Sequence, residues 1–242
     1  MENHENAPTN AQILELGALM FRQIPKDLTS ADTKFLIENP KVIRGVLRGL
    51  KSRARKHAQD SEAMLRGEWI EFYDRVFGIG TDIFMTRIPD EQPGFDRVLF
   101  IPEGLALYQA IAACRERFEV QTYIDKLDGD AFTNDRSPES GSYAIRLRNR
   151  READKELKNL SVNVLKERGT SGITLLERLV LELKYYYETG EHLDVENVTL
   201  CSGSRRSDGS VPHVYWHDGG LYVLWSPPDD ADGYLRSRAV VS

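Results

Sequence analysis

The feature that most constrains the fold of this chain is a pair of alternating segments joined by a short turn, at residues 211–226. Apolar side chains recur at every second position, as at Val214 before the turn and at Leu221 and Val223 after it. The turn at 218–220 reads Asp-Gly-Gly, which suits the positive backbone angles of a tight hairpin. Because neighbouring residues of a strand point to opposite faces, the pattern predicts an antiparallel hairpin with two distinct faces.

The two faces of this hairpin differ in character. The expected core face holds Val214, Trp216, Leu221, Val223 and Trp225. The opposite face is mixed polar and aromatic, and it holds His213, Tyr215, His217, Tyr222, Leu224 and Ser226. Aromatic and small polar side chains are typical of adaptable contact surfaces, so this second face is a candidate binding surface.

The segments before the hairpin predict three parts. Residues 1–94 form a mainly helical N-terminal unit, with helices expected from Asn10, from Ser30, from Asn39-Pro40 and from Ser61. Residues 95–141 form a connection with a strand at 97–101, a helix at 105–118, a short strand at 120–124 and a long loop. Residues 142–242 form the last domain.

The order of elements in this last domain predicts its class. A strand at 143–148 precedes two helices at 152–168 and 175–188, and strands follow at 198–201, in the hairpin and at 235–241. One strand, two helices and a run of antiparallel strands make an α+β arrangement.

Composition and charge limit the possible functions. The net charge of −6 argues against nucleic acid as a partner of the whole surface. The polar start of the chain, Met1 to Asn6, predicts neither a secretory signal nor a membrane span, so we expect a cytoplasmic protein without a membrane partner. Cys114 and Cys201 lack the spacing of metal ligands, and we expect reduced thiols and no cofactor.

The last 42 residues contain no Lys, Glu, Gln or Met, although the first 200 contain 40 of them. A blank of this length would arise by chance roughly once in ten thousand at that frequency. Two explanations are open. A strand-rich tail filled with Gly and Ser holds fewer Lys and Glu in any case. Alternatively, the codons of the tail are restricted.

A set of residues in the last domain favours the second explanation. It consists of Gly172 to Leu179, Thr199 to Arg205, Ser207-Asp208-Gly209, Val211-Pro212, Trp216, Leu221-Tyr222-Val223, Trp225 and Leu235 to Ser242. Through these residues, the chain resembles variable proteins of diversity-generating retroelements, above all those of candidate-phylum bacteria, over residues 142–242. The ending Leu235-Arg236-Ser237-Arg238 departs from the Gly-Phe-Arg ending that is common in the wider family.

The resemblance implies a C-type-lectin-like fold of the formylglycine-generating-enzyme subtype, with chosen codons diversified by error-prone copying at template adenines. Asn-type codons altered in this way cannot become Lys, Glu, Gln, Met or Trp, which fits the blank in the tail. The implied function is binding of an unknown ligand, most simply a protein, without catalysis. The positions that match the variable, ligand-binding slots are Arg206, Ser210, His213, Tyr215, His217, Asp218, Leu224, Ser226, Pro227, Asp229, Asp230, Asp232, Gly233 and Tyr234.

The motifs of metal sites and enzymes are absent from the sequence. His213 and His217 would lie about 13 Å apart along a strand, too far to share one ion. The acidic stretch Asp125 to Arg136 fails the calcium-loop pattern at its glycine and at its last position. No zinc helix motif, phosphate-cradling loop or nucleophile elbow is found. The cysteine pair of the fold's enzymatic relative has no counterpart near Cys201.

The segment 41–57 supports an alternative function. It holds Lys41, Arg44, Arg48, Lys51, Arg53, Arg55 and Lys56 and no acidic residue. On a helix, the apolar residues Val42, Ile43, Val46, Leu47 and Leu50 would form a buried stripe and the basic residues a face of their own. A nucleic-acid-binding or regulatory protein acting through Lys41–Lys56 is therefore the alternative to the diversified binding protein.

Overall fold

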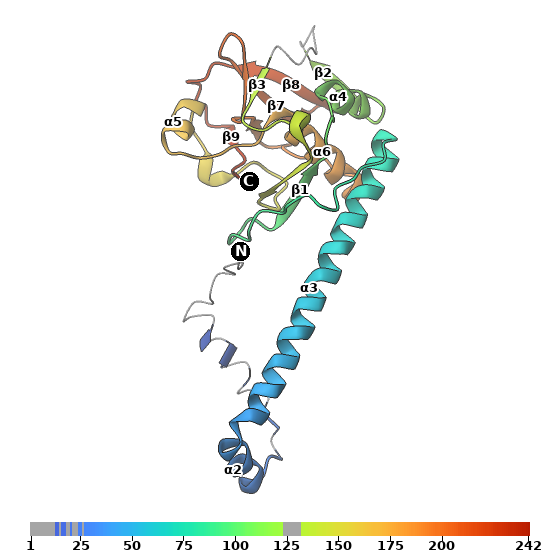
Figure 1. The fold of residues 1–242 in the computed structure, drawn as a ribbon. Coiled ribbons are helices and arrows are strands. Elements are labelled where there is room, and N and C mark those ends of the chain that lie inside the picture. The colour runs from blue at the N-terminus through green and yellow to red at the C-terminus, as the bar shows by residue number, and fades with distance from the viewer. Residues whose placement is uncertain (1–12, 15, 18–19, 21–23, 26, 123–131) are drawn as a thin grey trace. The chain divides into compact units, whose positions relative to one another are not determined.

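The computed structural model of the chain describes residues 13–14, 16–17, 20, 24–25, 27–122 and 132–242, except for the side chains of Ala54 and Arg55 (Figure 1). Its contacts separate two compact units, Met1–Glu62 and Ala63–Ser242. The sequence predicted boundaries near residues 94 and 141. The structure instead places one boundary at 62/63, because Trp69 and Ile83 belong to the same hydrophobic core as the tail.

The first unit is helical where the structure describes it. Helix α2 (Ser30–Glu38) begins after Thr29, whose hydroxyl accepts a hydrogen bond from the Asp32 N–H while the Asp32 carboxylate accepts one from the Thr29 N–H. Helix α3 (Pro40–Phe77) runs on into the second unit. The prediction of separate helices from Asn39-Pro40 and Ser61 was wrong, since no proline interrupts residues 41–77. The helix predicted from Asn10 lies largely outside the described residues.

The apolar stripe predicted on α3 is not buried. Its five members are all exposed: Val42, Ile43, Val46, Leu47 and Leu50. By contrast, the end of the same helix packs into the core of the second unit through Trp69, Phe72 and Tyr73, which are almost fully buried. The stripe prediction failed because periodicity identifies an apolar face but does not supply the element that covers it.

The second unit contains three sheets among the described residues (Figure 1). The first has the order β1-β4-β10, all antiparallel. The second has the order β2-β8-β7-β5-β9, with β2 parallel to β8 and β5 parallel to β9. The third pairs β3 with β6. The strands are β1 (Arg97–Ile101), β2 (Glu119–Thr122), β3 (Phe132–Asn134), β4 (Tyr143–Leu147), β5 (Val198–Leu200), β6 (Ser204–Arg206), β7 (Val211–His217), β8 (Gly220–Ser226), β9 (Leu235–Ser237) and β10 (Val240–Val241).

Helices α4 (Leu107–Arg115) and α6 (Leu175–Thr189) help to form the main core. The Thr174 hydroxyl and the Glu177 carboxylate cap the start of α6 reciprocally, and Gly190 ends it at a φ of 72°. Buried side chains of α6 join the core face of the hairpin in one hydrophobic cluster, as Leu183 and Val223 do. The mixed α+β class expected from the sequence is confirmed.

The helix predicted at residues 152–168 was wrong. The structure has a short 3-10 turn, η3 (Lys155–Leu157), and then α5 (Val162–Glu167). The Asp154 N–H donates to the Ser237 carbonyl and the Asn159 N–H to the Leu235 carbonyl, so this backbone pairs with β9 instead of forming helical bonds. The periodicity of the sequence gives no information on this long-range pairing.

A second, smaller core covers part of the hairpin's outer face. Val162 of α5 clusters with Val198, Leu200, Val211 and Leu235, and the ring of Tyr215 packs against the cluster's edge. The single strand predicted at 235–241 is in fact two, because β9 pairs with β5 and β10 with β4. Strands β3 and β6 were not predicted.

Candidate recognition face

The hairpin of β7 and β8 has the two faces that its sequence predicts. Val214 pairs with Val223 and Tyr215 with Tyr222. Val214, Leu221 and Val223 are fully buried, which confirms the predicted core face at these positions. Trp216 and Trp225, expected on the same face, are half-buried at its ends.

Aromatic rings form a continuous group on the opposite face. Tyr215 and Tyr222 stack with their ring centroids 5.1 Å apart and their planes 15° apart. The His213 ring lies 6.1 Å from Tyr215, and the His217 ring lies 6.3 Å from Tyr222. Rings held in this way offer apolar area with little side-chain entropy left to lose on binding.

His213 is a half-buried polar member of this face. Its Nδ1 lies 3.0 Å from the Ser226 hydroxyl. Burial lowers the pKa of His213 to about 4, and the negative charge of Asp230 opposes this shift. The imidazole is therefore neutral at pH 7, and it contributes a hydrogen-bonding group without a charge.

The loop between β8 and β9 supplies six of the predicted ligand-binding residues beside this face. The Tyr234 hydroxyl donates to the Asp232 carboxylate at 3.0 Å, which raises the pKa of Tyr234, while 53 % of the residue stays exposed. The loop is tied back by the Asn163 N–H, which donates to the Pro228 carbonyl. The six residues are Pro227, Asp229, Asp230, Asp232, Gly233 and Tyr234, and none of them is buried.

The remaining predicted residues are not all part of the aromatic face. Asp218 lies at the hairpin turn, 3.3 Å from the His217 ring nitrogen. The Arg206 guanidinium lies 5.2 Å from the centroid of Trp225, whose side chain belongs to the hairpin's other face, and Ser210 pairs with the backbone of Arg206. The structure therefore brings the residues after 212 together and leaves Arg206 and Ser210 apart.

Two residues differ in role from their sequence assignments. Ser226 is buried and supports His213, so its side chain is not on the accessible surface. Tyr222, which the resemblance assigned to the scaffold, stacks on Tyr215 and belongs to the aromatic face. The alternation of the hairpin already placed Tyr222 on this face, so the signal was present in the sequence.

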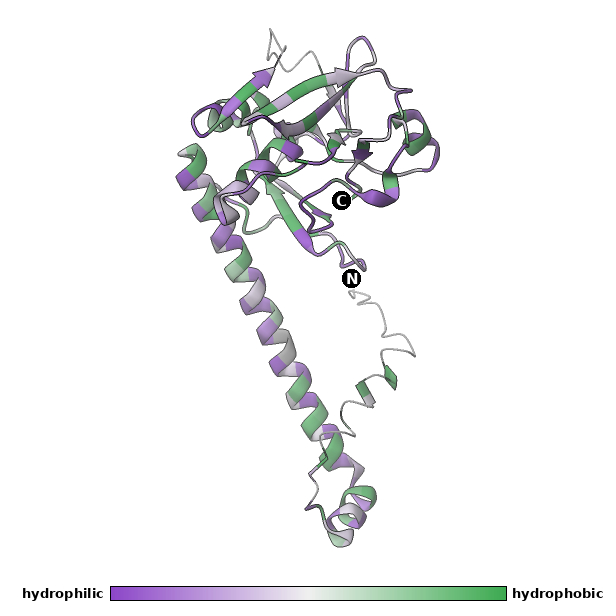
Figure 2. Cartoon of the chain, turned by 180° about the vertical axis from the view of Figure 1, so that it is seen from behind, coloured by the Kyte–Doolittle hydropathy of each residue, from purple (hydrophilic) through white to green (hydrophobic). Residues whose placement is uncertain are grey.

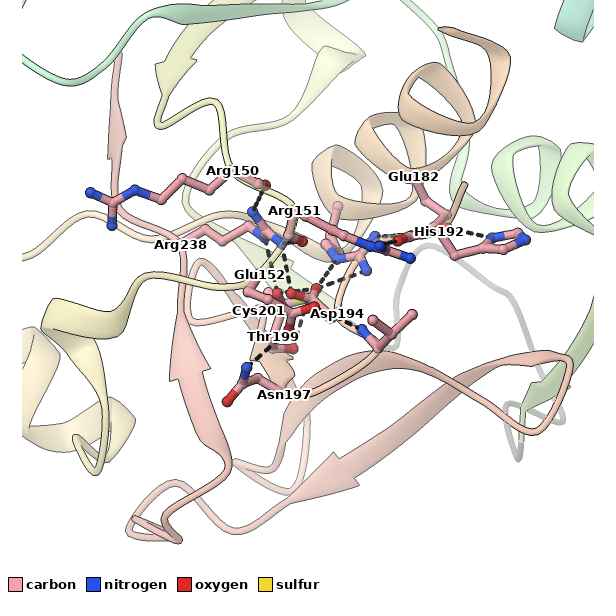
Figure 3. Close-up of polar contacts among 12 residues, drawn as sticks. Arg150, Arg151, Glu152, Glu182, His192, Asp194, Asn197, Thr199, Cys201 and Arg238 are labelled. Atoms are coloured by element: carbon pink, nitrogen blue, oxygen red, sulfur yellow. Dashed lines mark hydrogen bonds and ion pairs between the residues drawn. The ribbon is translucent and has the colours of Figure 1, made fainter. Parts of the chain in front are cut away.

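A buried ionic network holds the strands behind the recognition face (Figure 3). Asp194 accepts hydrogen bonds from Arg178 of α6 at 2.9 Å and from Arg238 at 2.6 Å. Arg178 also donates to Glu182 at 2.8 Å, and Arg238 to the Thr199 hydroxyl at 3.0 Å. Two guanidinium groups and two carboxylates balance one another, which offsets the cost of burying them.

The same network reaches the hairpin. The other Glu182 oxygen lies 2.9 Å from Nδ1 of His192, whose ring stacks on Trp216 with the centroids 3.3 Å apart. The backbone N–H of Trp216 donates a hydrogen bond to the backbone carbonyl of Asp194 at 3.0 Å. None of the fourteen predicted residues takes part in this network, so substitutions at these positions leave the ionic network itself unchanged.

Two cavities of the second unit lie away from this face. One of about 430 Å³ is lined by Arg87, Arg136 and Tyr143, and one of about 380 Å³ by Leu105 and Phe132, among others. Neither contains a predicted ligand-binding residue. Arg136 is committed to Glu177, to which it donates two hydrogen bonds at 2.7 and 2.9 Å.

Both thiols lie in the hydrophobic core of the described residues. Cys114 and Cys201 are fully buried, and burial raises the pKa of both thiols well above the ordinary range. Among the residues that the structure describes, no group of three or more His, Cys, Asp or Glu side chains could hold a metal ion. Residues 125–131 of the rejected calcium loop lie outside the described residues.

Among the described residues, no helix is long and apolar enough to cross a membrane. No family model, no curated protein and no solved structure matches the chain.

Proposed function

We propose that this chain is a recognition protein whose β7–β8 outer face and β8–β9 loop bind a ligand and are diversified by a retroelement. One observation carries the proposal. Along β8, Leu221 and Val223 are fully buried, whereas Tyr222 and Leu224 between and after them are half-exposed on the opposite face. A surface can vary freely only where its side chains do not also form the core.

The proposed scaffold is a C-type-lectin-like domain of the formylglycine-generating-enzyme subtype. The support consists of the family resemblance over residues 142–242 and of the mixed α+β architecture. The missing Lys, Glu, Gln and Met of the tail support diversification by adenine-directed copying. Thirteen of the fourteen implied positions lie outside the buried set, Ser226 being the exception.

The proposed ligand is a protein, and the proposed role includes no catalysis. Stacked tyrosines beside an acidic loop offer a broad contact area with polar groups at its edge, as protein interfaces do. Small molecules are usually held in enclosed cavities, and the two cavities described above contain none of the predicted residues. The buried thiol of Cys201 is unsuited to nucleophilic chemistry.

A display experiment with the full chain tests the proposal. One library varies His213, Tyr215, His217, Leu224 and Tyr234 together. A matched library varies five exposed residues of the second unit that lie off the face, namely Phe84, Met85, Tyr108, Tyr187 and Val195. Both are selected against the same folded protein target after protease treatment has removed unfolded chains.

We expect most members of both libraries to survive the protease, and target binders to come from the face library alone. If varying the face makes most chains protease-sensitive, or if both libraries yield binders at the same frequency, the face has no special role in recognition.

A further inference from the structure

The first unit exposes an apolar surface that nothing in the proposed recognition function uses. Five apolar residues of α3, namely Val42, Ile43, Val46, Leu47 and Leu50, are between 40 and 59 % exposed. Figure 2 shows hydrophobic and hydrophilic residues interleaved along this part of the helix. At about 100° per residue, these five side chains occupy one arc of roughly 140°.

Basic residues occupy the other side of the same helix segment. Lys41, Arg44, Arg48 and Lys51 fall within an arc of about 80° opposite the apolar arc, and Arg53 is an exception that falls on the apolar side. All of these basic residues are exposed, and no acidic residue occurs between Pro40 and Gln59. Within the described residues, none of these basic side chains takes part in an ion pair.

The combination of the two faces discriminates between possible partners. A nucleic acid would use the basic face, but its phosphates offer nothing to the exposed apolar arc. A second copy of the helix would cover the apolar arc, but the two basic faces would point away from that contact and would gain no partner. An anionic lipid surface satisfies both faces, because its acyl boundary takes apolar side chains and its headgroups attract Lys and Arg.

We propose that residues 40–56 of α3 lie along the surface of an anionic membrane, with Val46, Leu47 and Leu50 inserted and Lys41, Arg44, Arg48 and Lys51 among the headgroups. The attachment is peripheral, and it goes beyond the proposed recognition function. It departs from the sequence-based expectation of no membrane partner, which rested on the missing span. The consequence is that the recognition domain is held at a lipid surface.

Flotation of the full chain with lipid vesicles tests this inference at physiological salt. Vesicles of phosphatidylcholine alone are compared with vesicles that also contain phosphatidylglycerol. The apolar variant carries Val46→Gln, Leu47→Gln and Leu50→Gln, and the basic variant carries Lys41→Gln, Arg44→Gln, Arg48→Gln and Lys51→Gln. Gln keeps a good helix propensity, and the replaced side chains are exposed, so both variants remain folded.

The matched control carries Met85→Gln and Arg87→Gln in the second unit, where Met85 is 92 % exposed and the Arg87 side chain 84 % exposed. It removes an equally accessible apolar and basic side chain away from α3. We expect the natural chain and this control to float with the anionic vesicles only. The apolar variant should lose binding, and the basic variant should bind more weakly by about fivefold for each charge removed.

Four results would overturn the inference. The first is a natural chain that stays unbound to anionic vesicles. The second is binding to a DNA or RNA oligonucleotide, without vesicle binding, that the basic variant loses and the apolar variant retains. The third is a dimer in sedimentation that only the apolar variant dissolves, again without vesicle binding. A result in which both variants float like the natural chain would assign the binding to another segment.

Discussion

Arg238 donates a hydrogen bond to the Asp194 carboxylate at 2.6 Å across 44 residues of sequence, and neither side chain is accessible to solvent. The loop between β8 and β9, which we propose to be diversified, lies between these two residues in the sequence. Arg238 thus fixes the end of the loop to the same carboxylate that anchors α6 through Arg178. A chain held at both ends in this way can change its loop residues without changing its path through the core.

The network predicts a large cost for removing its central charge. Asp194→Asn preserves the side-chain shape and the left-handed backbone at φ 53°, which Asn tolerates, but it leaves two buried guanidinium groups with one carboxylate fewer. We expect a loss of about 3–5 kcal/mol in the free energy of unfolding, measured in urea. Glu156→Gln is the control, because its pair with Arg150 is exposed and should contribute about 1 kcal/mol or less. Equal losses would contradict the structural role of the network.

Two identical substitutions on β8 should differ strongly in their cost to the free energy of unfolding, because the two residues lie on opposite faces of the hairpin. Leu221→Ala opens a cavity in the main core and should cost about 2–5 kcal/mol of unfolding free energy. Leu224→Ala lies on the half-exposed outer face and should cost well under about 1 kcal/mol. Thermal or urea unfolding of the two variants compares the faces directly. Similar losses would mean that the outer face also carries the fold.

His213 predicts a defined dependence of stability on pH. Its pKa of about 4 in the folded chain lies below the ordinary value of 6.5, so between these pH values only the unfolded chain binds the proton. The contribution of His213 to the unfolding free energy is complete above pH 6.5 and is lost as the pH falls towards 4. The variant His213→Gln should therefore lose stability less steeply over this range than the natural chain.

Urea unfolding at several pH values between 4 and 7 measures this slope. His217→Gln is the matched control, because His217 lies exposed at the turn of the same strand. The natural chain and the control should share the steeper slope. If His213→Gln leaves the slope unchanged, the imidazole is not held neutral by burial.

The two cysteines predict a simple chemical result. Both thiols are fully buried and burial raises their pKa, so they should not react with a thiol reagent at pH 8 while the chain is folded. Both should react at once in denaturant. Rapid reaction of the folded chain would show that Cys114 or Cys201 is accessible, and it would reopen the question of thiol chemistry.

The sequence predicted local structure well where a strong local signal exists. The hairpin's two faces followed from strict alternation and a Gly-rich turn, and the helix expected at 175–188 matches α6 to within one residue. The expected strand at 97–101 matches β1 residue for residue. In these elements, the local pattern determines the type of the element and the face that is apolar.

The errors arose where distant residues decide the structure. The segment after Glu152 lies along β9 because the backbone N–H of Asp154 donates a hydrogen bond to the Ser237 carbonyl. The residues around Asp154 contain no local signal for this pairing. The ionic network joins Arg178, Asp194 and Arg238 from three separate segments, and no motif spacing marks it. Likewise, the stripe from Val42 to Leu50 has the pattern of a buried face, and only the fold shows that it is exposed.

If a retroelement diversifies the outer face of the hairpin and the following loop, as we propose, the DNA on either side of the gene should show this most directly. Sequencing should find a near-repeat of the segment that encodes Ser207 to Tyr234, close to a reverse transcriptase gene. The repeat should differ from the gene mainly where it reads adenine, at codons such as those of His213, Tyr215 and Asp230. A flank without repeat or reverse transcriptase, or differences that fall on buried scaffold codons such as Val214 and Val223, would contradict the claim.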